Sequence, residues 1–163
     1  MFQHITRTGT LTGLQPRIYV SCHKDDLELY LKPVCADIFA AQENCAVFYD
    51  DEPDRSLAEG ELEDLLSDMR MVVVPVTGRL LRERSRALDT EIPAALRLNI
   101  PVLPILFEED QTGELIGEFN STEVFSGLQF LNKYDRDPTA RSAFHWTIWD
   151  RSRNRSLLLT GSM

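Results

Sequence analysis

The chain has 163 residues, of which 43% are hydrophobic, and it carries a formal charge of -9. This length is enough to bury the core of one domain without disulfides or a structural metal. An acidic chain is a poor general ligand for nucleic acid or an anionic membrane, because phosphate contacts need clustered Lys and Arg. No apolar run approaches the roughly 20 residues that a membrane-spanning helix needs. We therefore expect a globular protein with no nucleic-acid or membrane partner.

The cysteines and the N-terminal segment indicate the compartment. Cys22, Cys35 and Cys45 are odd in number and show no CxxC spacing, so they predict neither a disulfide framework nor a zinc site. Residues 1–16 lack the apolar core of a signal peptide. This pattern favours a reducing cytoplasm and no bound metal.

The first third of the chain predicts two strands and a helix. Residues 1–16 are rich in Thr and Gly and are expected to be a flexible leader. The apolar run at 17–22 predicts a buried strand, and a stretch with apolar residues at helical spacing follows it. Pro33 lies within that stretch, so a kink or a late helix start is expected. A second apolar run at 45–50 predicts the next strand.

The middle of the chain is the part around which the rest is organised. An acidic loop punctuated by Pro53 and Gly60 follows the second strand, and loops of this length are uncommon unless functional. Two apolar, β-branched runs then flank an amphipathic stretch that contains Glu91, as in a βαβ unit with parallel strands. This alternation predicts a doubly wound, three-layer α/β domain over residues 17–138. The expected strands lie at 17–22, 45–50, 70–76, 101–107 and 128–131.

The segment 139–163 differs from the rest in charge. It holds four Arg and one Asp, for a net +3, whereas residues 1–138 carry -12. We expect a basic C-terminal tail in which a last helix can form. The apolar residues available to that helix are Phe144, Trp146, Ile148 and Trp149.

Common nucleotide-binding and catalytic motifs are missing from the sequence. It contains no GxxxxGK[ST], no GxGxxG and no GxSxG, so a P-loop, a Rossmann fingerprint and a hydrolase elbow are not supported. Asp25 and Asp26 follow the first strand as the acidic pair of a response-regulator receiver does. However, Val76 and Thr77 stand where a receiver carries its phosphoacceptor aspartate, which excludes that class.

Five stretches, taken in order, resemble a TIR domain of the bacterial enzymatic type found in Thoeris anti-phage defence. They are IYVSCHKDD, FYDDEPDRSLAEGELEDLLSDM, MVVVPVT, SRALDTEIPAAL and IPVLPI. The resemblance covers about residues 17–134 and implies a flavodoxin-like fold, with helices on both faces of a five-stranded parallel sheet in the order 2-1-3-4-5. It also implies that Asp50 to Gly60 is the BB loop, through which TIR domains associate.

The chain departs from the family pattern in two places. Ala-Leu stands at 87–88, where many enzymatic members have Trp-Cys, and Glu-Gly stands at 59–60, where animal signalling members have Pro-Gly. The tract Phe-His-Trp at 144–146 is similar to the C-terminal Phe-Trp box of the family. The residue that would stack on nicotinamide is therefore not identified by the resemblance.

The resemblance also implies the site residues. Glu91 falls where enzymatic TIR domains carry their catalytic glutamate, with NAD+ as the substrate and no cofactor. The implied substrate-binding residues are Ser21, Cys22, His23, Asp50 and Leu57. A simpler interpretation exists for most of them: a solvated helix-surface glutamate, a strand-end turn with a buried cysteine, and a solvated acidic loop.

One glutamate is chemically sufficient to cleave the bond between ribose and nicotinamide. Nicotinamide leaves as a neutral pyridine, so the general acid of ordinary glycosidases is not needed. Positive charge develops on the ribose, and a fixed carboxylate stabilises it. If the helix starts near Asp89 or Thr90, its N-terminal dipole favours an ionised Glu91, and Pro93 is tolerated in a first turn.

Three functions are consistent with the sequence. The first is an NAD+ glycohydrolase or cyclase that releases nicotinamide and forms ADP-ribose or a cyclic ADP-ribose isomer, in anti-phage signalling. The second is a non-catalytic TIR module that only associates with other TIR domains. The third is a nucleotide-binding flavodoxin-like domain without glycosidic chemistry. For the enzyme, the resemblance implies a site completed by the BB loop of a neighbouring copy, and hence self-association.

Overall fold

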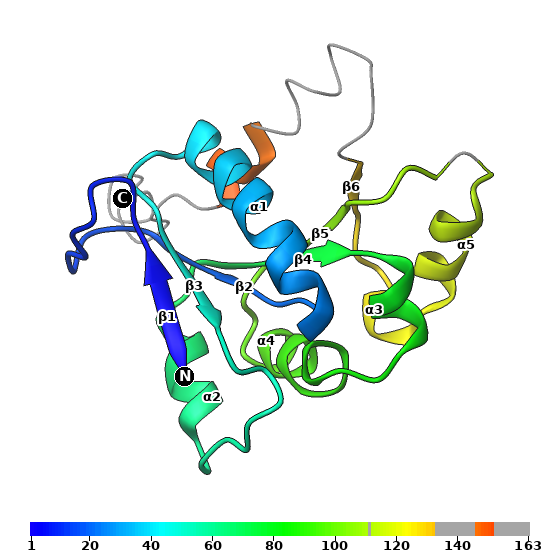
Figure 1. The fold of residues 1–163 in the computed structure, drawn as a ribbon, viewed down its shortest axis with the longest axis horizontal. Coiled ribbons are helices and arrows are strands. Elements are labelled where there is room, and N and C mark those ends of the chain that lie inside the picture. The colour runs from blue at the N-terminus through cyan, green and yellow to red at the C-terminus, as the bar shows by residue number, and fades with distance from the viewer. Residues whose placement is uncertain (111, 133–145, 152–163) are drawn as a thin grey trace, which may run out of the picture.

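The computed structural model describes residues 1–110, 112–132 and 146–151. Its centre is a six-stranded sheet in the order β1-β3-β2-β4-β5-β6, with helices on both faces (Figure 1). The strands are β1 (Phe2–Ile5), β2 (Arg17–Val20), β3 (Ala46–Asp50), β4 (Met71–Val76), β5 (Val102–Leu106) and β6 (Leu131–Asn132). The helical elements are η1 (Lys24–Asp26), α1 (Leu27–Ala41), α2 (Glu61–Ser67), α3 (Gly78–Arg82), η2 (Ala87–Glu91), α4 (Ile92–Arg97), α5 (Glu114–Ser121) and η3 (Glu123–Phe125). The predicted α/β class is confirmed.

The central strands build two hydrophobic cores, one on each face of the sheet. β4 is buried along its whole length because it lies between β2 and β5 and is covered on both faces. Side chains alternate along a strand, so Val72 and Val74 join the core beneath α2 and α4, while Met71 and Val73 face α1. A strand covered on both faces is apolar throughout, as the sequence MVVVPV is.

Two prolines lie within the central strands without disrupting the sheet. Pro75 in β4 lies beyond the last residue that pairs with β2, which is Val73. Pro104 in β5 lies before the first residue that pairs with β6, which is Ile105. Each proline, which has no N–H to donate, therefore stands where one flanking strand offers no pairing partner.

The prediction of a five-stranded, all-parallel sheet is wrong in the number of strands, because the sheet has six. Five parallel strands run in the order β3-β2-β4-β5-β6, which matches the expected 2-1-3-4-5, but β1 adds an antiparallel edge strand to β3. Residues 2–5 are therefore not a flexible leader. The sequence FQHI is short and half polar, which an edge strand tolerates because only one side of it pairs. This is why the pattern gave no strand signal there.

The helix that carries Glu91 begins earlier than the sequence suggested. A π turn at Ala87–Glu91 leads directly into α4, and the N–H of Ile92 donates to the carbonyl of Ala87. Pro93 cannot donate to the carbonyl of Asp89 and would crowd it, which accounts for the wider turn before it. Glu91 is thus beyond the first turn, and stabilisation by the helix dipole no longer applies.

Elsewhere, the helical predictions fall partly outside the described residues. Pro33 lies inside α1, which begins at Leu27 and does not start late. Of the basic tail 139–163, residues 146–151 are described and are helical, and Ile148 is buried in the core on the α1 face (Figure 1). Phe144 lies outside the described residues. Within the described ranges, no helix is both long enough and apolar enough to cross a membrane.

Candidate active site

Glu91 is a buried carboxylate held by two hydroxyl groups of the β2 segment. Only 3% of the residue is exposed, so the expectation of a solvated helix-surface glutamate is wrong. The Tyr19 hydroxyl donates to Oε2 at 2.5 Å, and the Ser21 hydroxyl donates to Oε1 at 2.8 Å. Tyr19 and Ser21 are two positions apart on an extended segment, so both side chains reach the same face of the sheet. The site therefore lies where β2 ends and the π turn passes over it.

Arg86 connects Glu91 to a second buried carboxylate. Its Nη2 donates to Asp50 Oδ2 at 2.6 Å and to Glu91 Oε2 at 3.2 Å, and its Nε lies 3.3 Å from the same Glu91 oxygen. Asp50 is the last residue of β3 and is 4% exposed. Two buried acids thus share one guanidinium, which fits the rule that buried charges are paired.

The predicted BB loop closes over this network through Arg55. Arg55 Nε donates to Asp50 Oδ2 at 3.0 Å, and its two terminal nitrogens donate to the Glu61 carboxylate at the start of α2. The backbone carbonyl of Arg55 also accepts from Arg86 Nη1 at 3.3 Å. Gly60 ends the loop with a φ of 78°, a left-handed conformation that glycine adopts without strain. The loop is therefore anchored to the same charges that surround Glu91.

The protonation states around Glu91 follow from burial and charge. Burial and the adjacent Glu91 carboxylate raise the pKa of Tyr19 well above its ordinary value, so Tyr19 remains a donor. Burial, with Glu91 and Asp26 nearby, raises the pKa of the Cys22 thiol, so Cys22 is not a thiolate nucleophile at neutral pH. Burial opposes ionisation of Asp50, but the Met1 ammonium group, Arg86 and the Glu52 N–H outweigh it and lower its pKa to about 2.

The structure brings some of the predicted site residues together and leaves others apart. Ser21 contacts Glu91, and Asp50 reaches it through Arg86. Buried Cys22 lines a small cavity together with Glu91. His23 is buried, but its Nδ1 accepts from the Asp25 N–H and caps η1. Leu57 is partly buried and packs against the hydrophobic core.

Two residues of the site were missed in the sequence. Tyr19 could have been found, because it lies two residues before Ser21 and strand alternation places both on one face. Arg86 gave no signal, because an arginine five residues before a glutamate does not meet it in a regular α-helix. The π turn between Arg86 and Glu91 was not predictable from the apolar pattern.

The cavity beside Glu91 is very small in this conformation. Its volume is about 10 Å³, with Tyr19, Cys22, Asp50, Pro53 and Glu91 among the lining residues. Ligand pockets for drug-sized molecules are usually some 300–1,000 Å³, so no nucleotide fits there as the chain stands.

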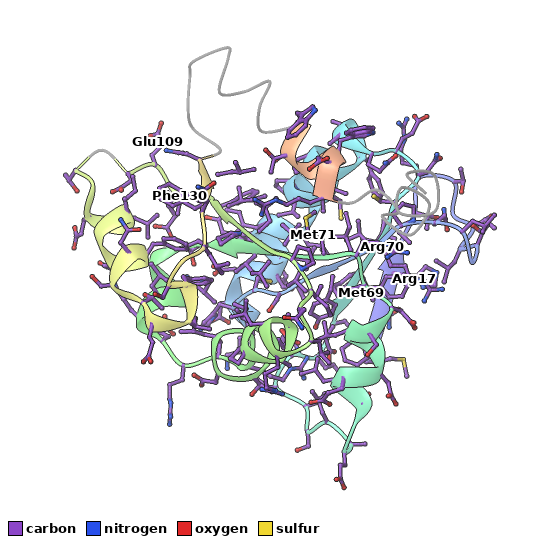
Figure 2. All side chains as sticks on the ribbon, turned by 180° about the vertical axis from the view of Figure 1, so that it is seen from behind. Arg17, Met69, Arg70, Met71, Glu109 and Phe130 are labelled. Carbon is purple, nitrogen blue, oxygen red and sulfur yellow. The ribbon has the colours of Figure 1, made fainter. Side chains whose placement is uncertain are left out.

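Larger hollows lie away from Glu91. One of about 300 Å³ is lined by Asp26, Tyr30, Arg79 and Glu108, among others. Another, of about 250 Å³, lies at the amino ends of β2 and β4, where Figure 2 shows Arg17 and Arg70 near each other. Neither hollow includes Glu91 among its lining residues.

One group of side chains in the described residues has the composition of a metal site. It consists of His23, Asp25 and Glu83, whose ligand atoms lie within 4.8 Å of one another. Because Nδ1 of His23 accepts a backbone N–H, a neutral ring carries its proton on Nε2, which faces Glu83 at 3.5 Å. In this tautomer, the ring nitrogen that faces Glu83 carries a proton and has no free lone pair with which to bind a metal ion.

Comparison with known proteins defines the class of fold. No family model and no curated protein matches the chain. The TIR domain of the Toll-related receptor TRR-2 from Hydra magnipapillata superposes with a TM-score of 0.54 at 12% identity, over 84% of this chain and 98% of that one. The TIR domains of the activated Roq1 resistosome, which recognises the pathogen effector XopQ, align at 14% identity with a TM-score of 0.39, over 85% of this chain and 84% of that one. The first of these likenesses shows that the chain has the TIR fold.

Proposed function

We propose that this protein is a cytoplasmic NAD+ nucleosidase that cleaves the nicotinamide–ribose bond. The products are nicotinamide and either ADP-ribose or a cyclic ADP-ribose isomer, and the biological setting is bacterial anti-phage signalling of the Thoeris type. The observation that supports the proposal is the buried Glu91 carboxylate, fixed by Tyr19 and Ser21 at the carboxyl end of the parallel sheet. Ligands of open α/β sheets bind at that edge.

The reaction needs a fixed negative charge more than it needs proton transfer. The C1′–N bond breaks with its electron pair going to the pyridine nitrogen, and nicotinamide leaves as a neutral molecule. The Glu91 carboxylate stabilises the positive charge that develops on the ribose. Water then adds at C1′ and releases a proton to solvent, giving ADP-ribose. If a ribose hydroxyl or an adenine nitrogen of the same molecule adds instead, the product is cyclic. No cofactor takes part.

Tyr19 and Ser21 are positioning residues in this scheme. Each donates one hydrogen bond to a different oxygen of Glu91, so the plane of the carboxylate is fixed before substrate arrives. A preorganised charge requires no rearrangement when the transition state forms, which is the main source of electrostatic catalysis.

The closed cavity implies that activity requires a conformational change. The cavity of about 10 Å³ admits no nucleotide, and Pro53 of the BB loop is one of its lining residues. Self-association that repositions the loop would open the site, in line with the resemblance to TIR domains whose sites are completed by a neighbouring copy.

The direct test is product analysis with Glu91→Gln and a matched control. Wild-type protein, Glu91→Gln and Glu63→Gln are incubated with NAD+, and nicotinamide and the ribosyl product are identified by chromatography and mass spectrometry. Glu63 is a partly exposed residue of α2 whose carboxylate lies 3.7 Å from the Arg97 guanidinium. We expect a loss of about 10²–10³-fold in turnover for Glu91→Gln and no loss for the control. Equal turnover by folded Glu91→Gln rules out the assigned role.

A non-catalytic TIR module is the second candidate. It is favoured by the ion pair of Glu91 with Arg86, which occupies the carboxylate in the described conformation. Concentrated protein that associates in sedimentation experiments, yet releases no nicotinamide at any concentration, would support this alternative.

A further inference from the structure

Arg86 is paired with the carboxylate of Glu91, the residue on which the proposed reaction rests. Among the described residues, it is the cation that contacts Glu91, through both Nε and Nη2. It is also one of two arginines that contact Asp50, the other being Arg55. Arg86 is largely buried, with a side chain 12% exposed, so little solvent screens these contacts.

We propose that Arg86 is a displaceable internal cation that occupies the place of the positively charged nicotinamide riboside end of the substrate. This inference rests on the proposed function. It adds an explanation of what keeps the site closed, and of which charge state of the nicotinamide group opens it. In the closed chain, Arg86 neutralises Glu91. Binding of an oxidised, cationic nicotinamide group replaces Arg86 at the carboxylate, whereas a reduced, neutral group has no charge with which to compete.

The contact distances show how Arg86 can leave Glu91 without becoming unpaired. Its bond to Asp50 is 2.6 Å long, whereas both contacts with Glu91 exceed 3.1 Å. The guanidinium is thus anchored at Asp50 and can rotate away from Glu91 while it keeps a buried counter-charge. An isolated buried charge would be costly, so this second acid is what makes displacement feasible.

The same guanidinium is tied to the BB loop. Arg86 Nη1 donates to the backbone carbonyl of Arg55, and Arg55 itself binds Asp50. Movement of the loop therefore removes one contact of Arg86, and release of Arg86 removes one contact of the loop. Displacement of the cation and opening of the loop favour each other.

The test compares a cation with its neutral counterpart. Nicotinamide riboside and its reduced form differ in charge but little in size, and neither carries phosphate. Their affinities are measured by titration calorimetry at pH 8 for wild-type protein, Arg86→Met and Arg86→Lys, with Arg97→Met as the matched control. Arg97 lies on α4, 66% exposed, and its ion pair is with Glu63. Circular dichroism verifies that each variant is folded.

We expect Arg86→Met to bind the cation about tenfold more tightly than wild type and the neutral form within about twofold. Arg86→Lys and Arg97→Met should keep the wild-type preference. If folded Arg86→Met binds the cation no more tightly than wild type, or gains equally for both forms, the proposal is overturned. Weaker binding by Arg86→Met would instead make Arg86 a ligand of the substrate, which also overturns it.

A measurement on wild-type protein decides the question if Arg86→Met does not fold. Crystals grown with saturating nicotinamide riboside should show the Arg86–Glu91 pair broken and the Arg86–Asp50 pair kept, and the reduced form should leave both pairs intact. An intact Arg86–Glu91 pair, with or without the cation in the site, contradicts the inference. The proposed function fails separately, if no variant releases nicotinamide from NAD+.

Discussion

Removing the Ser21 hydroxyl tests how much its hydrogen bond to the Glu91 carboxylate contributes to the stability of the fold. In the described part of the chain, Ser21 is the hydrogen-bond donor to Glu91 Oε1, whereas Oε2 has both Tyr19 and Arg86. Ser21→Ala therefore leaves one carboxylate oxygen of Glu91, a residue that is only 3% exposed, without its donor. Leaving a buried acceptor without its donor costs about 1–3 kcal/mol, and a charged acceptor lies at the upper end of this range.

The loss of unfolding free energy expected for Ser21→Ala can be compared with that expected for a second variant. Tyr19→Phe removes a bond to Oε2, but Arg86 continues to neutralise that oxygen, so we expect a smaller loss of about 1.5 kcal/mol. The control is Ser67→Ala, because the exposed Ser67 hydroxyl donates only to a carbonyl of its own helix. Its effect should lie within about 0.5 kcal/mol of zero.

The assay is equilibrium unfolding in urea at pH 7, followed by circular dichroism. Equal m-values across the variants are required, so that a change in midpoint reports a change in stability. A domain of this size has a stability of about 5–15 kcal/mol, so a loss of 2–3 kcal/mol is readily measured. If Ser21→Ala is no less stable than Ser67→Ala, the hydroxyl does not hold Glu91, and preorganisation of the carboxylate is refuted.

Two further predictions follow from the protonation states of the site. The pKa of Asp50 is lowered to about 2 in the folded chain, against about 3.9 in an unfolded one, so its stabilising contribution is complete above about pH 4 and is lost as the pH falls through 2. Acid titration should show this slope for wild type and a flatter one for Asp50→Asn; equal slopes would contradict it. Cys22 is buried and its thiol pKa is raised, so iodoacetamide should modify it slowly in native protein and rapidly in urea, as peptide mass mapping would show. Rapid modification of the native protein would mean that the site is open in solution.

Several features of the site could be predicted from the order of the elements. Polar residues that end neighbouring parallel strands meet at one edge, and Ser21 and Asp50 both lie near Glu91 for that reason. The burial of Glu91 was not predicted, although Glu91 lies three and four residues before Ala94 and Ala95 and therefore on the buried face of the helix. Arg86 was missed because a residue five positions before Glu91 meets it only through a π turn.

The edge strand shows a different limit of sequence reasoning. β1 was not predicted, since its four residues contain only two apolar side chains and the strand is held mainly by pairing with β3. Backbone pairing leaves no pattern in the side chains of so short a segment. Leu57 is the opposite case: it was expected in the substrate site because of its loop, yet it packs against the core. Membership of a loop does not say which side chains the loop turns inward.

A last prediction, about assembly, follows from the small volume of the cavity beside Glu91. The lone chain offers about 10 Å³ beside Glu91, so specific activity should depend on an event that moves the BB loop. A chain of charge -9 repels its own copies at low ionic strength, so association should be favoured by salt or crowding.

We expect nicotinamide release per molecule to rise with protein concentration. We also expect Glu59→Lys to change that rise without unfolding the domain, because Glu59 is an exposed residue of the loop. Sedimentation velocity on the same samples would report the oligomeric state. A specific activity that stays constant over a hundredfold dilution, with a monomer throughout, would mean that the loop opens within a single chain and that a neighbouring copy contributes nothing to the site.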